Sequence, residues 1–226
     1  MQLDCMSGGS IFDKRNYIMY SFLKYYLPLF LLIYLVVTFI LPSIRVYKKT
    51  GINPVTFGKS DNAHDYIGFI MKVLTGLLAA AVLLFSFSTD AYSYLNPIEY
   101  LQPGWIKYTG LFLIHASLIW IIIAQHHMKQ SWRIGIDEKN KTELITEGLF
   151  GISRNPIFLG MILSTVGIFF IIPDTLTFFV AATSYIVIQI QIRLEEDYLV
   201  KQHGTVYNAY KEKVKRLIGR NTITRK

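Results

Sequence analysis

The chain alternates between five apolar stretches and polar segments that separate them. The apolar stretches are residues 25–42, 67–87, 106–123, 157–172 and 176–192. Roughly 20 apolar residues span a bilayer as a helix, and in lipid the backbone groups must hydrogen-bond within their own segment. The pattern therefore predicts an all-α membrane protein, a bundle of about five transmembrane helices. Pro173 and Asp174 separate the last two stretches, which predicts a tight helical hairpin.

The composition favours the same class. Of the 226 residues, 52% are hydrophobic and only 17% are charged, against about 25% charged in a soluble domain. The net charge of +8 suits an anionic surface. Because the apolar stretches exclude a soluble nucleic-acid-binding protein, we expect anionic lipid at the basic tail and no nucleic acid as a partner. The single cysteine, Cys5, excludes an internal disulfide, and residues 1–24 lack the apolar core of a signal peptide.

The polar segments between the apolar stretches are alternately rich and poor in lysine and arginine. Segments 43–65, 129–156 and 193–226 are basic, whereas 88–107 has only Lys107. By the positive-inside rule, the N-terminus is expected outside and the tail in the cytoplasm, although the N-terminal segment is also basic. The expected location is the cytoplasmic membrane of a bacterium, or the endoplasmic reticulum membrane in a eukaryote.

This orientation brings two polar segments to one side of the hairpin. We divide the chain into residues 1–105, with two transmembrane helices, and 106–226, with three helices, a cytoplasmic loop and the tail. Pro156 is expected to open a helix, because Asn155 before it is pushed away from helical geometry. In the tail, Gln191 and Glu195 share a helix face. Glu195 could face a cationic ligand, or belong to an ordinary solvated helix.

Several short motifs follow one another in a fixed order on both sides of the hairpin. They are Ser131-Trp132-Arg133-Ile134-Gly135-Ile136, Leu144-Ile145-Thr146-Glu147-Gly148-Leu149-Phe150, Ser153-Arg154-Asn155-Pro156-Ile157-Phe158, Glu195-Glu196, His203-Gly204, Tyr207 and Tyr210. Together they resemble the superfamily of isoprenylcysteine carboxyl methyltransferases and phospholipid methyltransferases. The resemblance covers about residues 125–218.

The resemblance implies an enzyme that binds S-adenosylmethionine at the cytoplasmic face. Gln191 and Arg193 take the place of substrate contacts, and Arg193 and Glu196 are the candidate catalytic residues. A carboxylate and aromatic faces suit the sulfonium cation of this cofactor. The implied cofactor-binding residues are Thr142, Glu143, Leu144, Ile145, Gly148, Phe150, Asn155, Pro156, Ile157, Phe158 and Glu195.

Four residues depart from the family pattern and bear on the substrate. Asn155 replaces a common histidine, and Phe150 and Phe158 replace tyrosines. Gln191 stands where an arginine often holds a carboxylate substrate, and an amide cannot clamp a carboxylate as a guanidinium does. The first expected acceptor is the carboxylate of an isoprenylcysteine-like compound. A phospholipid amine, a small thiol, or a non-catalytic membrane scaffold are the alternatives.

Three histidines are further candidates for a functional role. His115 lies midway along the third apolar stretch, where an ionisable residue is a functional candidate. His126 and His127 are adjacent, so on a helix they point apart and make a poor metal pair. No His, Cys and carboxylate set has metal-ligand spacing, so no metal is predicted. The sequence leaves the oligomeric state open.

Overall fold

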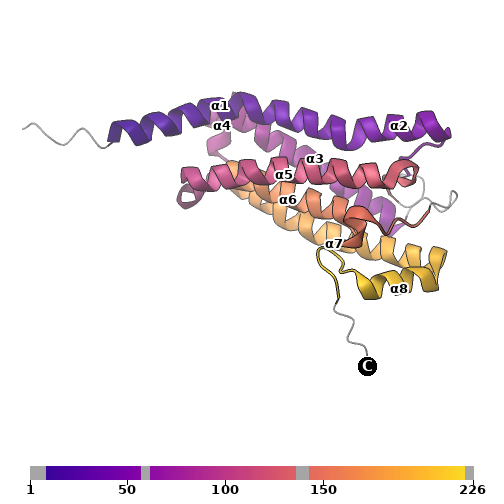
Figure 1. Cartoon of the computed structure of the whole chain (residues 1–226). Coiled ribbons are helices and arrows are strands. Elements are labelled where there is room, and N and C mark those ends of the chain that lie inside the picture. The colour runs from indigo at the N-terminus through magenta and orange to yellow at the C-terminus, as the bar shows by residue number, and fades with distance from the viewer. Residues whose placement is uncertain (1–8, 57–61, 136–142, 222–226) are drawn as a thin grey trace, which may run out of the picture.

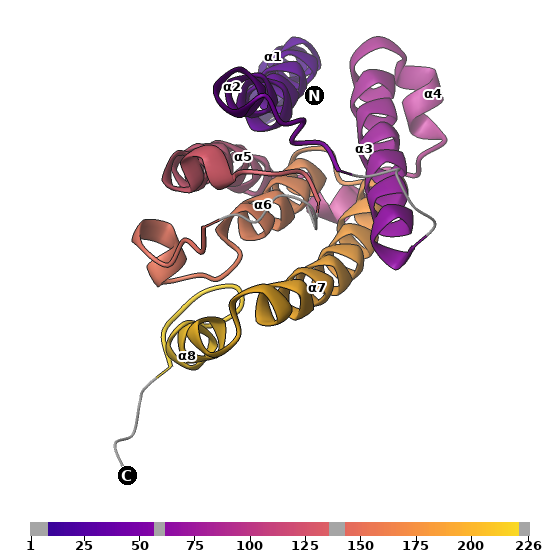
Figure 2. The ribbon, with the colours of Figure 1, turned by 90° about the vertical axis from the view of Figure 1, so that its right-hand side faces the viewer.

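The computed structural model describes residues 9–56, 62–135 and 143–221, and these ranges are mainly helical with no strand among them. Figures 1 and 2 show the helices as one elongated bundle, with α8 beside the end of α7. The helices are α1 (Gly9–Leu35), α2 (Leu41–Thr50), α3 (Ala63–Phe87), α4 (Thr89–Ser93), α5 (Gly104–Met128), α6 (Pro156–Ile171), α7 (Thr175–His203) and α8 (Thr205–Lys213).

Four helical segments are long and apolar enough to cross a membrane. They are Ile18–Thr50, α3, α5 and α7. These segments confirm the predicted all-α membrane fold. The fourth predicted span is α6, which has 16 residues and is therefore about 24 Å long, shorter than a bilayer core of about 30 Å.

The first span is longer than the sequence predicts. We expected it to end at Pro42, but the helix continues to Thr50. A π-helical turn, Val36–Ile40, joins α1 to α2, and the Leu41 N–H donates to the Val36 carbonyl five residues back. Pro42 then enters the first turn of α2, where its missing N–H is tolerated. The π-turn thus carries the helix past a residue that usually ends one.

Small residues bring α5 and α6 into close contact. A Cβ atom on Gly110 of α5 would lie 2.6 Å from the Gly167 carbonyl oxygen of α6. Along the same interface, the Ser117 and Ser164 hydroxyls lie 2.7 Å apart. Such small residues let helix backbones approach each other in a membrane. α6 also packs on α7, and α3 packs on both α1 and α7.

The turn between α6 and α7 confirms the predicted hairpin and is closed by Asp174. Its carboxylate accepts from the Thr177 N–H at 2.8 Å, and the Asp174 N–H donates to the Thr177 hydroxyl at 3.2 Å. This reciprocal pair is a capping box. Asp174 is fully buried, and burial raises its pKa above the ordinary value of 3.8.

Replacing Asp174 with alanine is expected to lower the free energy of unfolding in detergent by about 1 kcal/mol, because the N-cap acceptor is lost. Asp174→Asn keeps an acceptor and removes the buried charge. Since the pKa of Asp174 is raised in the folded state, its contribution to stability falls as pH rises above about 4. The free energy of unfolding of Asp174→Asn, relative to that of wild type, should therefore be higher at pH 7 than at pH 4. If Asp174→Ala and Asp174→Asn lower the free energy of unfolding equally at pH 7, this explanation is wrong.

Candidate functional site

A cavity of about 220 Å³ lies around the start of α6 and is lined by segments that are far apart in the sequence. The π-turn, α3, α5 and α7 supply its walls, together with the loops on either side of residues 136–142. Its lining residues are Thr38, Phe39, Met71, Ile121, Gln125, Met128, Ser131, Trp132, Arg133, Ile134, Gly135, Phe150, Arg154, Asn155, Pro156, Ile157, Phe158, Met161, Gln191, Glu195, Tyr198 and Leu199.

Seven of the residues implied by the resemblance meet at this cavity. Gln191 and Glu195 lie one turn apart on α7, and the Gln191 Nε2 donates to Glu195 Oε1 at 2.8 Å. Gln191 is only 1% exposed, and within the described residues its Oε1 has no hydrogen-bond partner. The other five are Phe150, Asn155, Pro156, Ile157 and Phe158.

Pro156 opens α6 as predicted, and Asn155 before it is non-helical, with φ −134° and ψ 58°. This break turns the chain at the cavity, so that Asn155 and the first turn of α6 both line it. The sequence prediction for this junction is confirmed.

Other cofactor candidates lie elsewhere. Thr142 falls outside the described residues, and Glu143, Leu144, Ile145 and Gly148 do not line the cavity. Leu144 packs instead against the tail, in a cluster centred on buried tyrosines of α8. Gly148 has φ +61°, and a Cβ atom there would lie 2.5 Å from the His127 ring. A larger residue at Gly148 would therefore displace this loop.

Arg193 and Glu196 also lie away from the cavity. Arg193 is exposed, and its Nη1 donates to the Gln189 carbonyl of α7 at 2.6 Å. Glu196 is 3% exposed and forms ion pairs with Arg154 at 3.0 Å and Arg216 at 2.7 Å. Neither predicted catalytic side chain therefore lies where it would touch a ligand in this cavity.

The loop that carries Phe150 is tied to α8. The loop forms a 3₁₀ turn, Gly148–Gly151, and the Tyr210 hydroxyl donates to the Phe150 carbonyl at 2.6 Å. Burial raises the pKa of Tyr210 above its usual value and that of Tyr207 to about 12. Both phenols therefore stay neutral near pH 7, and Tyr210 remains a donor to the loop.

Residues 214–221 follow α8 and support the other half of the loop. The Arg154 N–H donates to the Lys215 carbonyl at 3.1 Å, and the Gly219 N–H donates to the Ile152 carbonyl at 2.7 Å. The Asn155 side chain donates to the Arg216 carbonyl at 3.0 Å. These bonds fix the backbone next to the cavity, a role that the sequence did not indicate.

The N-terminal helices contribute lining residues that sequence reasoning missed. Thr38 and Phe39 come from the π-turn, and Met71 comes from α3. Gln125, a buried polar residue near the end of α5, donates to the Thr38 carbonyl at 2.7 Å. No motif marks these positions, although π-turns often occur at functional sites.

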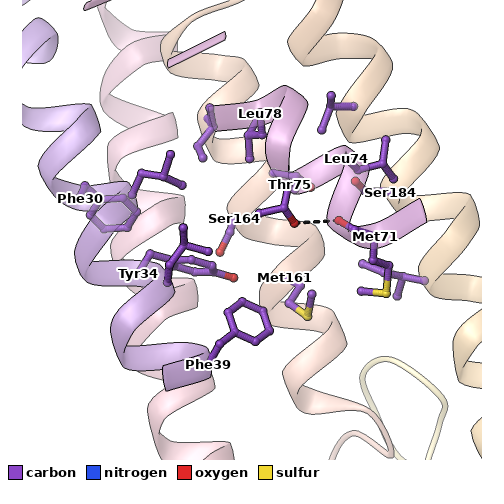
Figure 3. Close-up of a pocket in the computed structure, with 16 residues that line it drawn as sticks. Phe30, Tyr34, Phe39, Met71, Leu74, Thr75, Leu78, Met161, Ser164 and Ser184 are labelled. Atoms are coloured by element: carbon purple, nitrogen blue, oxygen red, sulfur yellow. Dashed lines mark hydrogen bonds between the residues drawn. The ribbon is translucent and has the colours of Figure 1, made fainter. Parts of the chain in front are cut away.

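A second, smaller cavity of about 70 Å³ lies beside the first, within the helical bundle. Both cavities are lined by Phe39, Met71 and Met161. Figure 3 shows this apolar chamber between aromatic, leucine and methionine side chains. Its Thr75 hydroxyl donates to the Met71 carbonyl at 2.8 Å, and the Ser164 hydroxyl donates to the Gly160 carbonyl at 3.0 Å. The chamber is therefore suited to hydrocarbon.

The histidines take no part in either cavity. His115 contacts the Tyr26 hydroxyl through Nε2, and its Nδ1 lies 2.6 Å from the Leu111 carbonyl oxygen. His127 accepts from the Leu149 N–H at 3.3 Å. Among the residues that the structure describes, no three His, Cys, Asp or Glu side chains form a metal-binding group.

Comparison with known families finds a similarity to membrane methyltransferases over part of the chain. Residues 105–206 match the model of the phospholipid methyltransferase family. That family belongs to the superfamily that also contains the isoprenylcysteine carboxyl methyltransferases, so the resemblance is confirmed. Enzymes of this family generally use S-adenosylmethionine. The matched range covers α5 from its second residue, and all of α6 and α7. No curated protein matches the chain.

Proposed function

We propose that this protein binds S-adenosylmethionine in the larger cavity and transfers the methyl group to a lipophilic acceptor. One observation carries the proposal. Phe150 and the Asn155–Phe158 segment lie far from Glu195 in the sequence, yet all of them line one cavity within an all-α membrane bundle.

The cavity has the chemistry that this cofactor requires. Bound S-adenosylmethionine supplies an electrophilic methyl group on a sulfonium cation. Glu195 brings a carboxylate to the cavity, and Trp132, Phe150 and Phe158 bring aromatic rings. An anionic group and aromatic faces stabilise a desolvated cation. The residues that line the cavity are therefore chemically suited to S-adenosylmethionine.

We assign Glu195 as the residue that faces the sulfonium cation of S-adenosylmethionine. The hydrogen bond from Gln191 Nε2 to Glu195 Oε1 holds the carboxylate in one orientation. Methyl transfer needs reactants that are aligned and a site from which water is excluded. It does not need a general acid or a general base for every methyl acceptor. The loop held by Tyr210 would align the cofactor, and the buried walls would exclude water.

The apolar chamber would receive the hydrocarbon of the acceptor. It adjoins the larger cavity through Phe39, Met71 and Met161, so a chain lying there would leave its polar end in the larger cavity. The carboxylate of an isoprenylcysteine-like compound stays the first candidate. A phospholipid amine or a small thiol remain alternatives within the same reaction class.

We further propose that the cavity opens on the cytoplasmic side, with the N-terminus outside. Lys213, Lys215 and Arg220 are exposed next to the loop and α8, where they would attract anionic lipid. This surface would keep the tail at the membrane face.

The test of the cofactor site is S-adenosylmethionine binding to detergent-purified protein by calorimetry, with no methyl acceptor present. We expect Glu195→Gln to weaken binding at least tenfold, about 1.4 kcal/mol, because the cation-facing charge is lost. Asp197→Asn is the matched control, since it removes an exposed carboxylate two residues further along α7, and it should bind as wild type does. Absence of binding by well-folded wild type would favour a non-catalytic scaffold.

A further inference from the structure

The chain after α8 forms a small hairpin beside the start of α6. The Lys215 N–H donates to the Gly219 carbonyl at 2.8 Å, and Val214 and Arg220 form an antiparallel bridge. Gly219 closes the turn with φ +112°, a conformation that favours glycine. Residues 213–221 are called the tail hairpin below.

The tail hairpin lies at a boundary of the membrane. Because α6 and α7 cross the membrane in opposite directions, the turn between them lies at one boundary. The 16 residues of α6 cover about 24 Å from this turn, most of a hydrocarbon core of about 30 Å. Residues 152–155, which precede α6 and are bonded to the tail hairpin, therefore lie at the opposite boundary. Figure 2, which looks along the bundle, shows α8 at its edge, so the tail hairpin that follows α8 lies where lipid surrounds the bundle.

The surface of the tail hairpin combines an apolar tip with basic flanks. Ile218 at the tip is 61% exposed, and Ile152 of the bonded loop is 38% exposed. Lys213 and Lys215 are exposed beside them, and residues 211–221 contain five basic side chains against one acidic side chain. Segments that lie in a membrane interface place apolar side chains at the acyl boundary and basic side chains at the headgroups. The tail hairpin has both features.

We propose that the tail hairpin is an anchor in an anionic membrane surface. Ile218 enters the acyl boundary, and Lys213 and Lys215 bind the phosphates of anionic lipids. A bilayer supplies both the hydrocarbon and the negative charge that this surface requires, whereas a soluble anion supplies only the charge. The insertion does not depend on the proposed enzymatic activity.

The anchor is connected to the larger cavity through the loop that the tail hairpin holds. The Arg154 N–H donates to the Lys215 carbonyl at 3.1 Å, and the Asn155 side chain donates to the Arg216 carbonyl at 3.0 Å. Arg154 and Asn155 both line the cavity. Lipid that fixes the tail hairpin therefore also fixes this wall of the cavity, and anionic lipid should strengthen cofactor binding. This second part of the inference rests on the proposed function and adds a regulator to it.

The first test measures the depth of Ile218 in nanodiscs of phosphatidylglycerol. The full chain carries Cys5→Ser, which removes its single cysteine, and a nitroxide label on Ile218→Cys. The label should be accessible to oxygen and shielded from a water-soluble nickel complex. Val206→Cys is the matched control, because Val206 is 64% exposed but follows the end of α7, which runs eight residues past Glu195, about 12 Å. A label at Val206 should be open to nickel.

The second test removes the charges of the anchor. Lys213→Gln with Lys215→Gln should move the Ile218 label toward water in phosphatidylglycerol nanodiscs. Lys48→Gln with Lys49→Gln, exposed on α2, removes the same charge elsewhere and should leave the label in place. By calorimetry, wild type should bind S-adenosylmethionine about fivefold more tightly in phosphatidylglycerol than in phosphatidylcholine nanodiscs. The tail-hairpin variant should lose this difference, and the α2 variant should keep it.

The outcomes separate the anchor from the proposed function. An Ile218 label as open to nickel as the Val206 label would overturn the anchor, and equal depth in both lipids would overturn an anionic surface as the partner. If inorganic phosphate in phosphatidylcholine nanodiscs moves the label as phosphatidylglycerol does, a soluble anion is the ligand and the proposal is wrong. Equal affinity for S-adenosylmethionine in both lipids would overturn the coupling. If Ile218 inserts but well-folded wild type binds no S-adenosylmethionine in either lipid, the anchor is supported and the proposed function fails. Thermal unfolding will check that each variant is folded.

Discussion

Glu196→Ala is expected to lower the free energy of unfolding by about 3 kcal/mol. Breaking a buried ion pair usually costs about 3–5 kcal/mol, because the remaining charge is left uncompensated. The loss of Glu196 would leave Arg154, whose side chain is 9% exposed, without its ion pair and close to the guanidinium of Arg216. Arg216 is 35% exposed, and water would stabilise its charge, so we choose the lower end of the range.

The measurement is chemical unfolding in mixed micelles, followed by tryptophan fluorescence. Asp197→Ala, on the exposed side of α7, should change stability by less than about 0.5 kcal/mol. The double variant Glu196→Leu with Arg154→Met should recover most of the loss, because apolar residues often replace a buried pair at little cost. A double variant as unstable as Glu196→Ala would show that lost packing, and not uncompensated charge, is the cause.

Gly110→Ala should also cost about 3 kcal/mol, at the upper end of the range for overpacking. The added Cβ atom would lie 2.6 Å from the Gly167 carbonyl oxygen and 2.8 Å from an Ile171 side-chain carbon. A backbone atom cannot move aside as a flexible side chain does, so α5 and α6 would have to separate. The Ser117–Ser164 hydrogen bond at this interface would then be lost or lengthened.

Gly76→Ala is the matched control for this substitution. Gly76 lies inside α3 with nothing within 4 Å of an added Cβ atom, so alanine should raise stability by about 0.5–1 kcal/mol through helix propensity. The same unfolding assay compares both variants. If Gly110→Ala behaves as Gly76→Ala does, the close approach of α5 and α6 is not required for stability.

The sequence predicted the helices well because apolar length alone defines a membrane span. The hairpin at Pro173 and the start of α6 at Pro156 were predicted correctly, since proline marks both. The first span was misjudged at Pro42, because the π-turn that carries the helix past it leaves no mark in the apolar pattern. α4 was also missed, because five residues are too few for a periodic signal.

The cavity was predicted only where residues resemble a known motif. Phe150, Asn155 and Glu195 were found in this way, and all three line it. Phe39 and Met71 were missed because nothing in an apolar helix says which face meets a cavity. Glu196 was predicted to be catalytic as part of the Glu195-Glu196 motif. Only the structure shows that its carboxylate meets two arginines.

The bonds between the loop at 150–155 and residues 214–220 bear on biosynthesis. The loop leaves the ribosome about sixty residues before its partners, and it precedes both helices of the hairpin. During that interval the Ile152 carbonyl and the Arg154 N–H lack the backbone partners they have in the finished fold. The membrane helices can insert in order as they are made, whereas this wall of the cavity closes only after translation has passed α8.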